Sequence, residues 1–235
     1  MRIVGLQKLT LLDYPGKVAC TVFLGGCNFR CPFCHNGQLL DHQAETIMEP
    51  EELIGFLSKR KGILDGVCIT GGEPTLQPDL PQLLAPIREF GFCIKLDTNG
   101  YRPDVLRKLV EAGLVDYVAM DVKNSPTRYG QTVGVPQLSL CKIEESLRFL
   151  ISGQVDYELR TTVVEELHSE DSVREMGQWL AALDSARKPK KLFLQSFVDR
   201  DSVLLGGLHA PQVRTLERYG KILEPYVEKV TLRGT

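Results

Sequence analysis

Short apolar runs alternate with amphipathic segments from residue 17 onward, and this alternation limits the possible folds more than any other feature of the chain. The apolar runs predict strands, and the amphipathic segments predict helices between and after them. The predicted strands cover residues 18–24, 66–70, 92–97, 117–122, 157–164, 191–195 and 227–232, and the predicted helices cover 51–59, 80–90, 104–111, 143–151, 172–183 and 211–223. Residues 125–140 form a long connection to which no element is assigned.

Alternation at this spacing favours an α/β fold, in which parallel strands are joined by right-handed crossovers. An open sheet and a partial barrel share the same linear pattern. In both architectures the chemistry gathers at the carboxyl ends of the parallel strands, so the segments that follow each predicted strand are the places to look for a site.

The size and charge of the chain narrow its organisation and its partners. A length of 235 residues suits one domain over 1–235, with an N-terminal approach segment (1–16), a core (17–200) and a C-terminal helix and strand (201–235). The formal net charge of −2 offers no basic footprint for nucleic acid or for an anionic membrane. No stretch approaches the roughly 18 apolar residues of a membrane span. We therefore expect a cytoplasmic protein that acts on a protein or a small molecule.

Three cysteines crowd into the segment GGCNFRCPFCHN, directly after the first predicted strand. Cys27, Cys31 and Cys34 have the spacing Cys-x3-Cys-x2-Cys, which indicates a metal centre rather than disulfides. Three thiolates without a fourth cysteine at matching spacing favour a [4Fe–4S] cluster in which one iron stays open for a substrate. The alternative is a structural zinc site, which needs four ligands. Its fourth ligand would be His35, directly after Cys34, where simultaneous ligation is sterically awkward.

This motif resembles the signature of the radical S-adenosylmethionine (SAM) superfamily. The resemblance implies a partial (βα)6 barrel of the TIM type as the radical SAM core. It also implies that the three cysteines bind three irons, that SAM binds the fourth, and that the reduced cluster cleaves SAM to methionine and a 5′-deoxyadenosyl radical. Phe33 stands at the aromatic position of the motif, as a cofactor contact or as a plain core aromatic.

The sequence GGEP follows the second predicted strand. Its two glycines allow the backbone to approach a ligand closely, whereas the plain interpretation is a strand-to-helix turn. The tetrapeptide resembles the GGEP motif of the superfamily. That resemblance implies that Gly71, Gly72 and Glu73 contribute to cofactor binding, at the amino group of the methionine part of SAM.

The sequences DTNG and DVK end the third and fourth predicted strands, where both are common in ordinary turns. They also resemble segments of the glycyl-radical activating enzymes. This implies a monovalent cation held by Asp97, Thr98 and Asp121, with Asp121 and Lys123 contacting the cofactor. Such a cation would offset negative charge that is otherwise buried unpaired.

Arg160 lies within the fifth predicted strand, where a buried guanidinium needs an anionic partner. A solvated strand face is the plain alternative. The activating enzymes carry an arginine on this strand, which implies that Arg160 binds the methionine carboxylate. The sixth strand departs from the formate-lyase activating enzymes, because Phe197 stands near the place of their histidine and Gln195 is the nearest polar residue. This departure argues against a histidine contact to adenine and against the formate-lyase subtype.

The other cysteines and three histidines are assigned no role in the site. We expect the isolated cysteines to pack as small hydrophobic residues and the histidines to lie on the surface or in loops. These residues are Cys20, Cys68, Cys93, Cys141, His42, His168 and His209.

The approach to the cysteines narrows the family further. The segment LTLLDYPGKVACTVFLGGCNFRCPFCHNGQL resembles the activating proteins of anaerobic ribonucleoside-triphosphate reductase, and the likeness continues to the terminal VTLRG. The resemblance implies that the radical removes hydrogen from a backbone glycine of that partner enzyme, leaving a stored glycyl radical. It also implies a reducing electron donor such as flavodoxin or ferredoxin. The DYPG sequence itself is interpreted as a turn, without a catalytic role.

Two alternatives stay open. One is a radical SAM enzyme that acts on another glycyl-radical enzyme or on a small molecule, although DYPGK and CHN match the activating proteins better. The other is a non-catalytic module that binds zinc or an iron–sulfur cluster. Metal analysis separates the last case, because one zinc without sulfide would remove the radical mechanism.

Overall fold

The computed structural model describes residues 1–40 and 44–234, and its fold belongs to the predicted α/β class. Within these residues, eight strands follow one another in chain order in a mostly parallel sheet. By their internal contacts the residues fall into two compact units. The first unit holds Met1–Asn28, Gln38–Thr98 and Arg102–Ala119, and the second holds Phe29–Gly37, Asn99–Tyr101 and Met120–Thr235.

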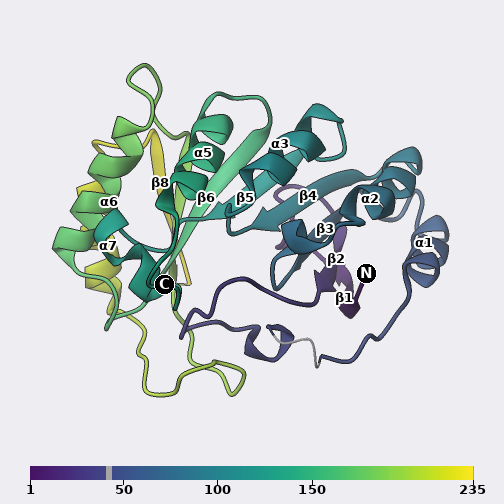
Figure 1. Ribbon diagram of the computed structural model, residues 1–235, viewed down its shortest axis with the longest axis horizontal. Coiled ribbons are helices and arrows are strands. Elements are labelled where there is room, and N and C mark those ends of the chain that lie inside the picture. The colour runs from purple at the N-terminus through teal and green to yellow at the C-terminus, as the bar shows by residue number, and fades with distance from the viewer. Residues whose placement is uncertain (41–43, 235) are drawn as a thin grey trace. The chain divides into compact units, whose positions relative to one another are not determined.

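The first unit is built on parallel strands covered by helices. Its elements are β1 (Ile3–Thr10), β2 (Ala19–Leu24), η1 (Gly37–Leu39, which begins in the second unit), α1 (Pro50–Ser58), β3 (Gly66–Gly71), η2 (Pro74–Leu76), α2 (Leu80–Glu89), β4 (Cys93–Thr98), α3 (Pro103–Glu111) and the start of β5 (Tyr117–Asp121). Strands β2, β3 and β4 are parallel, with Cys20 opposite Val67 and Val67 opposite Ile94. Helix α1 packs against α2, and α2 packs against β4 (Figure 1).

Proline and acidic side chains start these helices. A proline occupies the first turn of α1, α2 and α3, where its missing N–H has no helical partner to lose. At α1 the side chain of Glu49 accepts from the backbone of Glu52, and the Glu52 side chain accepts from the Glu49 N–H over 2.9 Å. This reciprocal capping fixes where the helix begins.

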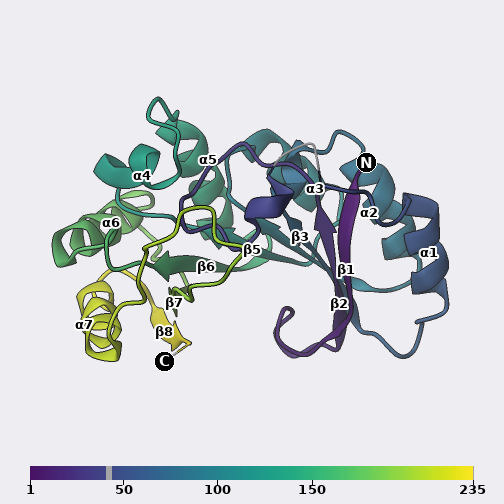
Figure 2. The same cartoon turned by 90° about the horizontal axis from the view of Figure 1, so that it is seen from below.

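Strand β1 lies within the predicted approach segment over 1–16, where no strand was predicted. Its sequence mixes polar and apolar residues, so it lacks the continuous apolar run of a buried strand. It pairs antiparallel with β2, with Leu6 opposite Val22 and Gln7 opposite Thr21. Figure 2 shows the connection between β1 and β2 as a loop that curls beyond the ends of both strands.

The DYPG sequence forms the turn predicted for it. The Lys17 N–H donates to the Tyr14 carbonyl over 3.2 Å. The Tyr14 side chain is buried, and its ring lies 6.0 Å from that of Tyr117. The turn therefore places the Tyr14 ring in the interior of the first unit, where it packs against Tyr117.

The second unit repeats the strand and helix pattern. It holds the end of β5, α4 (Pro126–Thr132), α5 (Leu140–Ile151), β6 (Asp156–Val163), α6 (Glu170–Ala182), β7 (Lys191–Ser196), α7 (Val213–Leu223) and β8 (Lys229–Arg233). Strands β6, β7 and β8 are parallel, and α6 packs against α7 (Figure 1). Helix α4 was not predicted within 125–140, because its seven residues carry too few apolar side chains to show a period.

An ion pair ties the last strand into the second unit. Arg233 in β8 donates to both carboxylate oxygens of buried Glu158 in β6, at 3.3 Å each. Its guanidinium also lies 3.4 Å from the ring centroid of Phe193 in β7. Arg233, in the terminal VTLRG sequence, thus links β8 to both β6 and β7.

No helix in the described part of the chain is long and apolar enough to cross a membrane.

Candidate active site

The three cysteines of the motif are free thiols, and they belong to different units. Cys27 follows β2 in the first unit, whereas Cys31 and Cys34 lie in segment 29–37 of the second. Free thiols are the ligand chemistry that iron–sulfur clusters require. The donor set therefore fits the predicted cluster, and the assignment of these three ligands stays a prediction.

Cys31 and Cys34 share a turn, in which the Cys34 N–H donates to the Cys31 carbonyl over 3.1 Å. Burial raises the pKa of the Cys31 thiol to about 11, although the ammonium of Lys123 acts in the opposite direction. Burial likewise raises the pKa of Cys34, against a backbone hydrogen bond from Asn36 and the same ammonium. Because both thiols hold their protons when buried, a cationic iron centre is the partner that would make them thiolates.

Phe33 lies between these two cysteines and is buried. The ammonium nitrogen of Lys123 is 5.8 Å from the centroid of its ring, within the range of a cation–π contact. Phe33 is therefore a buried aromatic residue that borders the charged group of Lys123. Its contact with a cofactor stays a prediction.

Phe197, which stands where the resemblance would place a histidine, is buried and stacks on His35. The ring centroids are 5.5 Å apart, and the ring planes differ by 10°. His35 Nε2 donates to the carbonyl of Val198 over 2.7 Å. The segment after β7 thus holds the residue next to Cys34, a link that no sequence pattern had suggested.

Two further backbone hydrogen bonds fix the same loop. The Arg30 N–H donates to the Val133 carbonyl over 2.8 Å, and the Leu205 N–H donates to the Pro32 carbonyl over 2.9 Å. A Cβ on Gly134 would lie 2.5 Å from the Arg30 carbonyl oxygen, so only glycine permits this approach. The loop that carries Cys31 and Cys34 is therefore held from both sides within the second unit.

Asp121, Lys123 and Arg160 form one network of ion pairs, while their predicted contacts with a cofactor stay predictions. The Asp121 carboxylate accepts from Lys123 Nζ over 2.8 Å and from Arg160 Nε over 3.0 Å. Burial raises the pKa of Asp121, but the two cations outweigh it and bring the value to about 2. Burial also opposes the charge of Lys123, yet Asp121 raises the Lys123 pKa well above its usual range. All three groups are charged at neutral pH, with one positive charge in excess.

The backbone of this network is also fixed by side chains. Thr161 Oγ1 donates to the Val122 carbonyl over 2.7 Å, and His168 Nε2 donates to the Lys123 carbonyl over 3.0 Å. Burial lowers the pKa of His168, so the ring is neutral and can serve as this donor. His168 lies in a loop, as predicted, but its side chain is buried and bonded to the backbone rather than placed on the surface.

Gly71 and Gly72 bring the end of β3 against the segment that leads to Cys27. Gly71 has a φ of +125°, and a Cβ there would lie 2.2 Å from the Leu24 carbonyl oxygen. A Cβ on Gly72 would lie 2.1 Å from the carbonyl oxygen of Gly26. The glycines therefore serve first to let two backbone segments meet.

Glu73 is buried, and its carboxylate has firm partners in the first unit. Its Oε1 accepts from the Thr75 N–H over 3.1 Å, from the Thr75 hydroxyl and from the Thr98 hydroxyl over 2.7 Å. These bonds join the start of η2 to the end of β4. These bonds fix the position of the Glu73 carboxylate. Cofactor binding by Gly71, Gly72 and Glu73 stays a prediction.

Asp97 forms an ion pair that the sequence analysis did not foresee. Its Oδ1 accepts from Nζ of Lys95, two residues earlier in β4. Side chains two residues apart on a strand share a face, so the spacing alone could have suggested the pair. The Lys95 side chain is only 2% exposed, which makes this lysine a buried charge in the first unit.

The cysteines and histidines that were given no role in the site agree only in part with their predicted positions. Cys20 and Cys68 are buried as expected, whereas Cys141 is exposed and does not pack in a core. His209 is exposed and pairs with Glu166 over 2.6 Å, and His42 lies outside the described residues.

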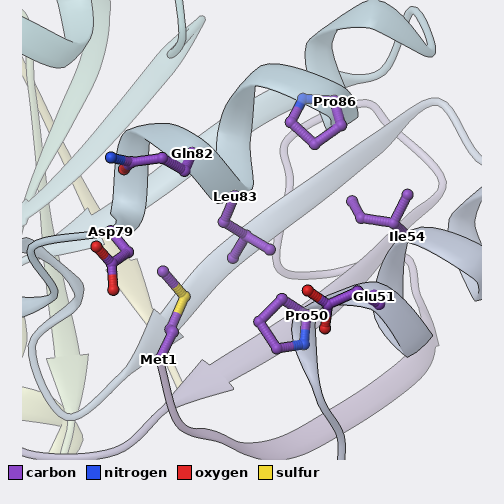
Figure 3. Close-up of a pocket in the computed structure, with 8 residues that line it drawn as sticks. All are labelled: Met1, Pro50, Glu51, Ile54, Asp79, Gln82, Leu83 and Pro86. Carbon is purple, nitrogen blue, oxygen red and sulfur yellow. The ribbon is translucent and has the colours of Figure 1, made fainter.

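A pocket of about 430 Å³ in the first unit lies apart from these residues (Figure 3). Its lining comes from the N-terminus, α1, α2 and the residue before α2, and it includes Met1, Ile54, Asp79, Leu83 and Pro86. No residue of the predicted site lines it. The pocket is therefore not part of the predicted site.

Comparison with known proteins supplies the family. The family model of the radical SAM superfamily matches residues 21–176. A protein of Methanocaldococcus jannaschii named "putative glycyl-radical enzyme activating enzyme" is 32% identical, over 98% of this chain and 95% of its own length. The pyruvate formate-lyase 1-activating enzyme of Escherichia coli is 27% identical over 97% of both chains.

A solved structure supports the fold. Streptococcus suis SuiB bound to S-adenosylmethionine superposes with a TM-score of 0.68 at 13% identity, over 91% of this chain. This chain spans about half of that protein, 52% of its length. The chain therefore belongs to the radical SAM superfamily, whose members bind a [4Fe–4S] cluster and S-adenosylmethionine, and within it to the enzymes that activate glycyl-radical enzymes.

Proposed function

We propose that this chain cleaves S-adenosylmethionine reductively at a [4Fe–4S] cluster held by the three motif cysteines, and installs a glycyl radical on anaerobic ribonucleoside-triphosphate reductase. The observation that carries the proposal is the network of Asp121, Lys123 and Arg160. The charge of Lys123 acts on the thiols of Cys31 and Cys34 in the same unit. An excess positive charge beside cluster thiols suits a cofactor that brings a carboxylate.

When bound, the cluster supplies the electron that breaks a carbon–sulfur bond of SAM and gives methionine and the 5′-deoxyadenosyl radical. The residues of the chain position the cofactor. Arg160 and Lys123 attract the methionine carboxylate, while Asp121 holds both cations in place through bonds of 3.0 and 2.8 Å. The buried ring of Phe33 lies 5.8 Å from the Lys123 ammonium and covers part of its surroundings with an apolar group.

The glycine-rich segment contributes through its backbone. Gly71 and Gly72 let the strand end lie against the segment before Cys27, and Glu73 is fixed by three donors on one oxygen. We assign the Glu73 carboxylate to the amino group of SAM. A carboxylate fixed before the cofactor arrives loses little entropy on binding.

The partner is supported by the approach sequence LTLLDYPGK and the terminal VTLRG, which resemble the activating proteins of the anaerobic reductase. A second candidate is the activation of a pyruvate formate-lyase. The similarity to the Escherichia coli activating enzyme over 97% of both chains favours it. The stack of Phe197 on His35 speaks against it, because an aromatic side chain occupies the place of the expected histidine.

The reductant and the compartment complete the proposal. A small electron-transfer protein such as flavodoxin or ferredoxin reduces the cluster. The described cysteines are all free thiols, which suits the reducing environment of the cytoplasm.

The test is anaerobic reconstitution with iron and sulfide, followed by reduction and measurement of 5′-deoxyadenosine with each partner enzyme. A glycyl doublet in the electron paramagnetic resonance spectrum of the anaerobic reductase is the expected result. A doublet only on pyruvate formate-lyase would select the second candidate. A fully loaded cluster that cleaves no SAM would overturn the proposal as a whole.

Cysteine variants provide the matched control. Cys31→Ser removes one proposed cluster ligand and should abolish SAM cleavage together with cluster absorbance. Cys141→Ser changes an exposed thiol outside the site and should leave both unchanged. Equal loss in the two variants would show that the assay reports general thiol damage.

A further inference from the structure

Lys95 is a buried cation in the middle of a strand. It lies in β4 opposite Cys68 of β3, and Cys68 lies opposite Thr21 of β2. The whole residue is 1% exposed. An ammonium group taken from water to such a place is costly unless an anion accompanies it.

Asp97 is the anion that accompanies it. Nζ of Lys95 donates to Oδ1 of Asp97, and the two side chains emerge from the same face of β4. The Asp97 side chain is 17% exposed, against 2% for Lys95. The lysine therefore approaches the carboxylate from the interior, and the carboxylate keeps some contact with the surface.

Cys68 and Asp13 are titratable groups near the pair. Cys68 lies within electrostatic range of Lys95, Asp97 and Asp13, and burial holds its thiol in the neutral form. Asp13 accepts a hydrogen bond from Thr21 over 2.6 Å. Among these described neighbours, Asp97 is the carboxylate that Lys95 contacts directly.

This arrangement bears on the monovalent cation predicted at Asp97, Thr98 and Asp121. Asp97 already holds an ammonium, and the Thr98 hydroxyl donates to Glu73. In the second unit, Asp121 already holds two cationic side chains. Each predicted carboxylate ligand thus has a protein cation, so these residues do not fit a site that needs a further positive charge.

We propose that Lys95 is the built-in cation of Asp97, and that it makes SAM binding by this chain independent of monovalent metal ions. The role rests on the proposed SAM site. Lys95 acts as a positioning residue, because it fixes and neutralises the Asp97 carboxylate from within the strand. A neutral residue at position 95 would remove this ammonium from the Asp97 carboxylate, and a monovalent ion could then take its place.

The first measurement is the affinity of the cluster-loaded protein for SAM, by isothermal titration calorimetry in choline, sodium, potassium and ammonium chloride at equal ionic strength. The unmodified protein should bind equally in all four salts. Lys95→Ala should bind about tenfold more weakly in choline chloride and recover in at least one salt whose cation fits the vacated space. Lys95→Met fills that space and should not recover, while Lys95→Arg keeps the charge and should stay independent of the salt.

Two results would overturn the proposal. One is a requirement of the unmodified protein for sodium or potassium. The other is a Lys95→Ala variant that binds SAM as tightly as the unmodified protein in choline, or that recovers in none of the three salts, since the role of Lys95 would then be structural only.

Thermal unfolding of the protein without its cluster gives a second readout, independent of radical chemistry. The melting temperature of Lys95→Ala should rise when potassium, sodium or ammonium replaces choline, and that of the unmodified protein should not.

If Lys95→Ala fails to fold, Lys95→Met/Asp97→Asn removes both charges, and recovered folding of this double variant supports the pairing. A double variant no more stable than Lys95→Met contradicts it. If SAM is bound but never cleaved, the proposed function fails while these binding and melting results still decide the role of Lys95.

Discussion

Strands β4 and β5 each have a lysine and an aspartate two residues apart near the carboxyl end, but in opposite order. In β4 a lysine precedes an aspartate by two residues, as Lys95 and Asp97. At the end of β5 an aspartate precedes a lysine by two residues, as Asp121 and Lys123. Each lysine pairs with its aspartate, yet the Lys95 side chain is 2% exposed and the Lys123 side chain 15%.

The order of the two residues explains their different uses. Lys95 lies within β4, on a face of the strand that is buried. A lysine after the strand has left the sheet, and it reaches the ring of Phe33 and influences the thiol of Cys31. The first pair is therefore suited to hold a fixed charge, and the second to meet a ligand.

The largest expected effect follows from this difference in burial. Lys95→Met leaves the Asp97 carboxylate without its buried partner and should lower the free energy of unfolding by about 3–5 kcal/mol. Lys123→Met should cost less, about 2 kcal/mol, because Asp121 keeps the guanidinium of Arg160. Urea denaturation of both variants without the cluster measures the difference. Equal losses would remove the distinction between the two pairs.

For SAM cleavage, a large effect is expected at the second pair. Asp121→Asn frees Lys123 and Arg160 from the carboxylate that orients them, and misplaced positioning groups reduce rates by roughly 100-fold. The formation of 5′-deoxyadenosine, normalised to the iron content of each preparation, is the readout. Lys123→Met serves as the comparison, since it removes one cation and leaves the other in place. Unchanged cleavage by Asp121→Asn would exclude the network from cofactor positioning.

The fold was predictable wherever the apolar pattern was strong. The predicted strands from β2 to β8 and six of the helices agree with the structure to within a few residues. Strand β1 was missed because Gln7 and Lys8 interrupt its apolar residues, and an edge strand buries only part of its length. Helix α4 was missed because seven residues are too few to establish a period.

Family resemblance, rather than residue chemistry alone, singled out the candidate site residues that the structure brings together. Asp121, Lys123 and Arg160 were each proposed from the sequence, and the structure brings the three together. Lys95 and His168 were missed, because the burial of a polar side chain depends on tertiary packing that no local pattern records. The only local signal was the spacing of two between Lys95 and Asp97.

A smaller effect tests the support of Lys123 by His168. Burial lowers the pKa of His168, so the unfolded chain binds a proton that the folded chain does not. Its contribution to stability is therefore complete above the ordinary pKa of about 6.5 and is lost as the pH falls, by at most about 1.4 kcal/mol per pH unit. Urea denaturation from pH 8 to pH 5 should show a flatter profile for His168→Gln than for the unmodified protein.

His209 provides the control of opposite sign. Glu166 raises the pKa of this exposed histidine, so its contribution is present below the ordinary value and lost as the pH rises. His209→Gln should therefore leave the acid side of the profile steeper than His168→Gln does. The same profile for both variants would mean that neither ring accounts for the pH dependence.

The smallest effect is expected at an ion pair that burial does not strengthen. Arg102 and Asp104 interact over 3.1 Å, with side chains 39% and 55% exposed. Water screens such a pair, so Asp104→Asn should change the free energy of unfolding by less than about 1 kcal/mol, and the change should vanish at high salt. Urea denaturation at low and at 1 M salt, beside Lys95→Met, measures both. If Asp104→Asn and Lys95→Met lowered the free energy of unfolding equally, the burial of Lys95 could not explain the loss of stability in Lys95→Met. A loss that salt does not change, seen for Lys95→Met alone, would show that the loss comes from burial.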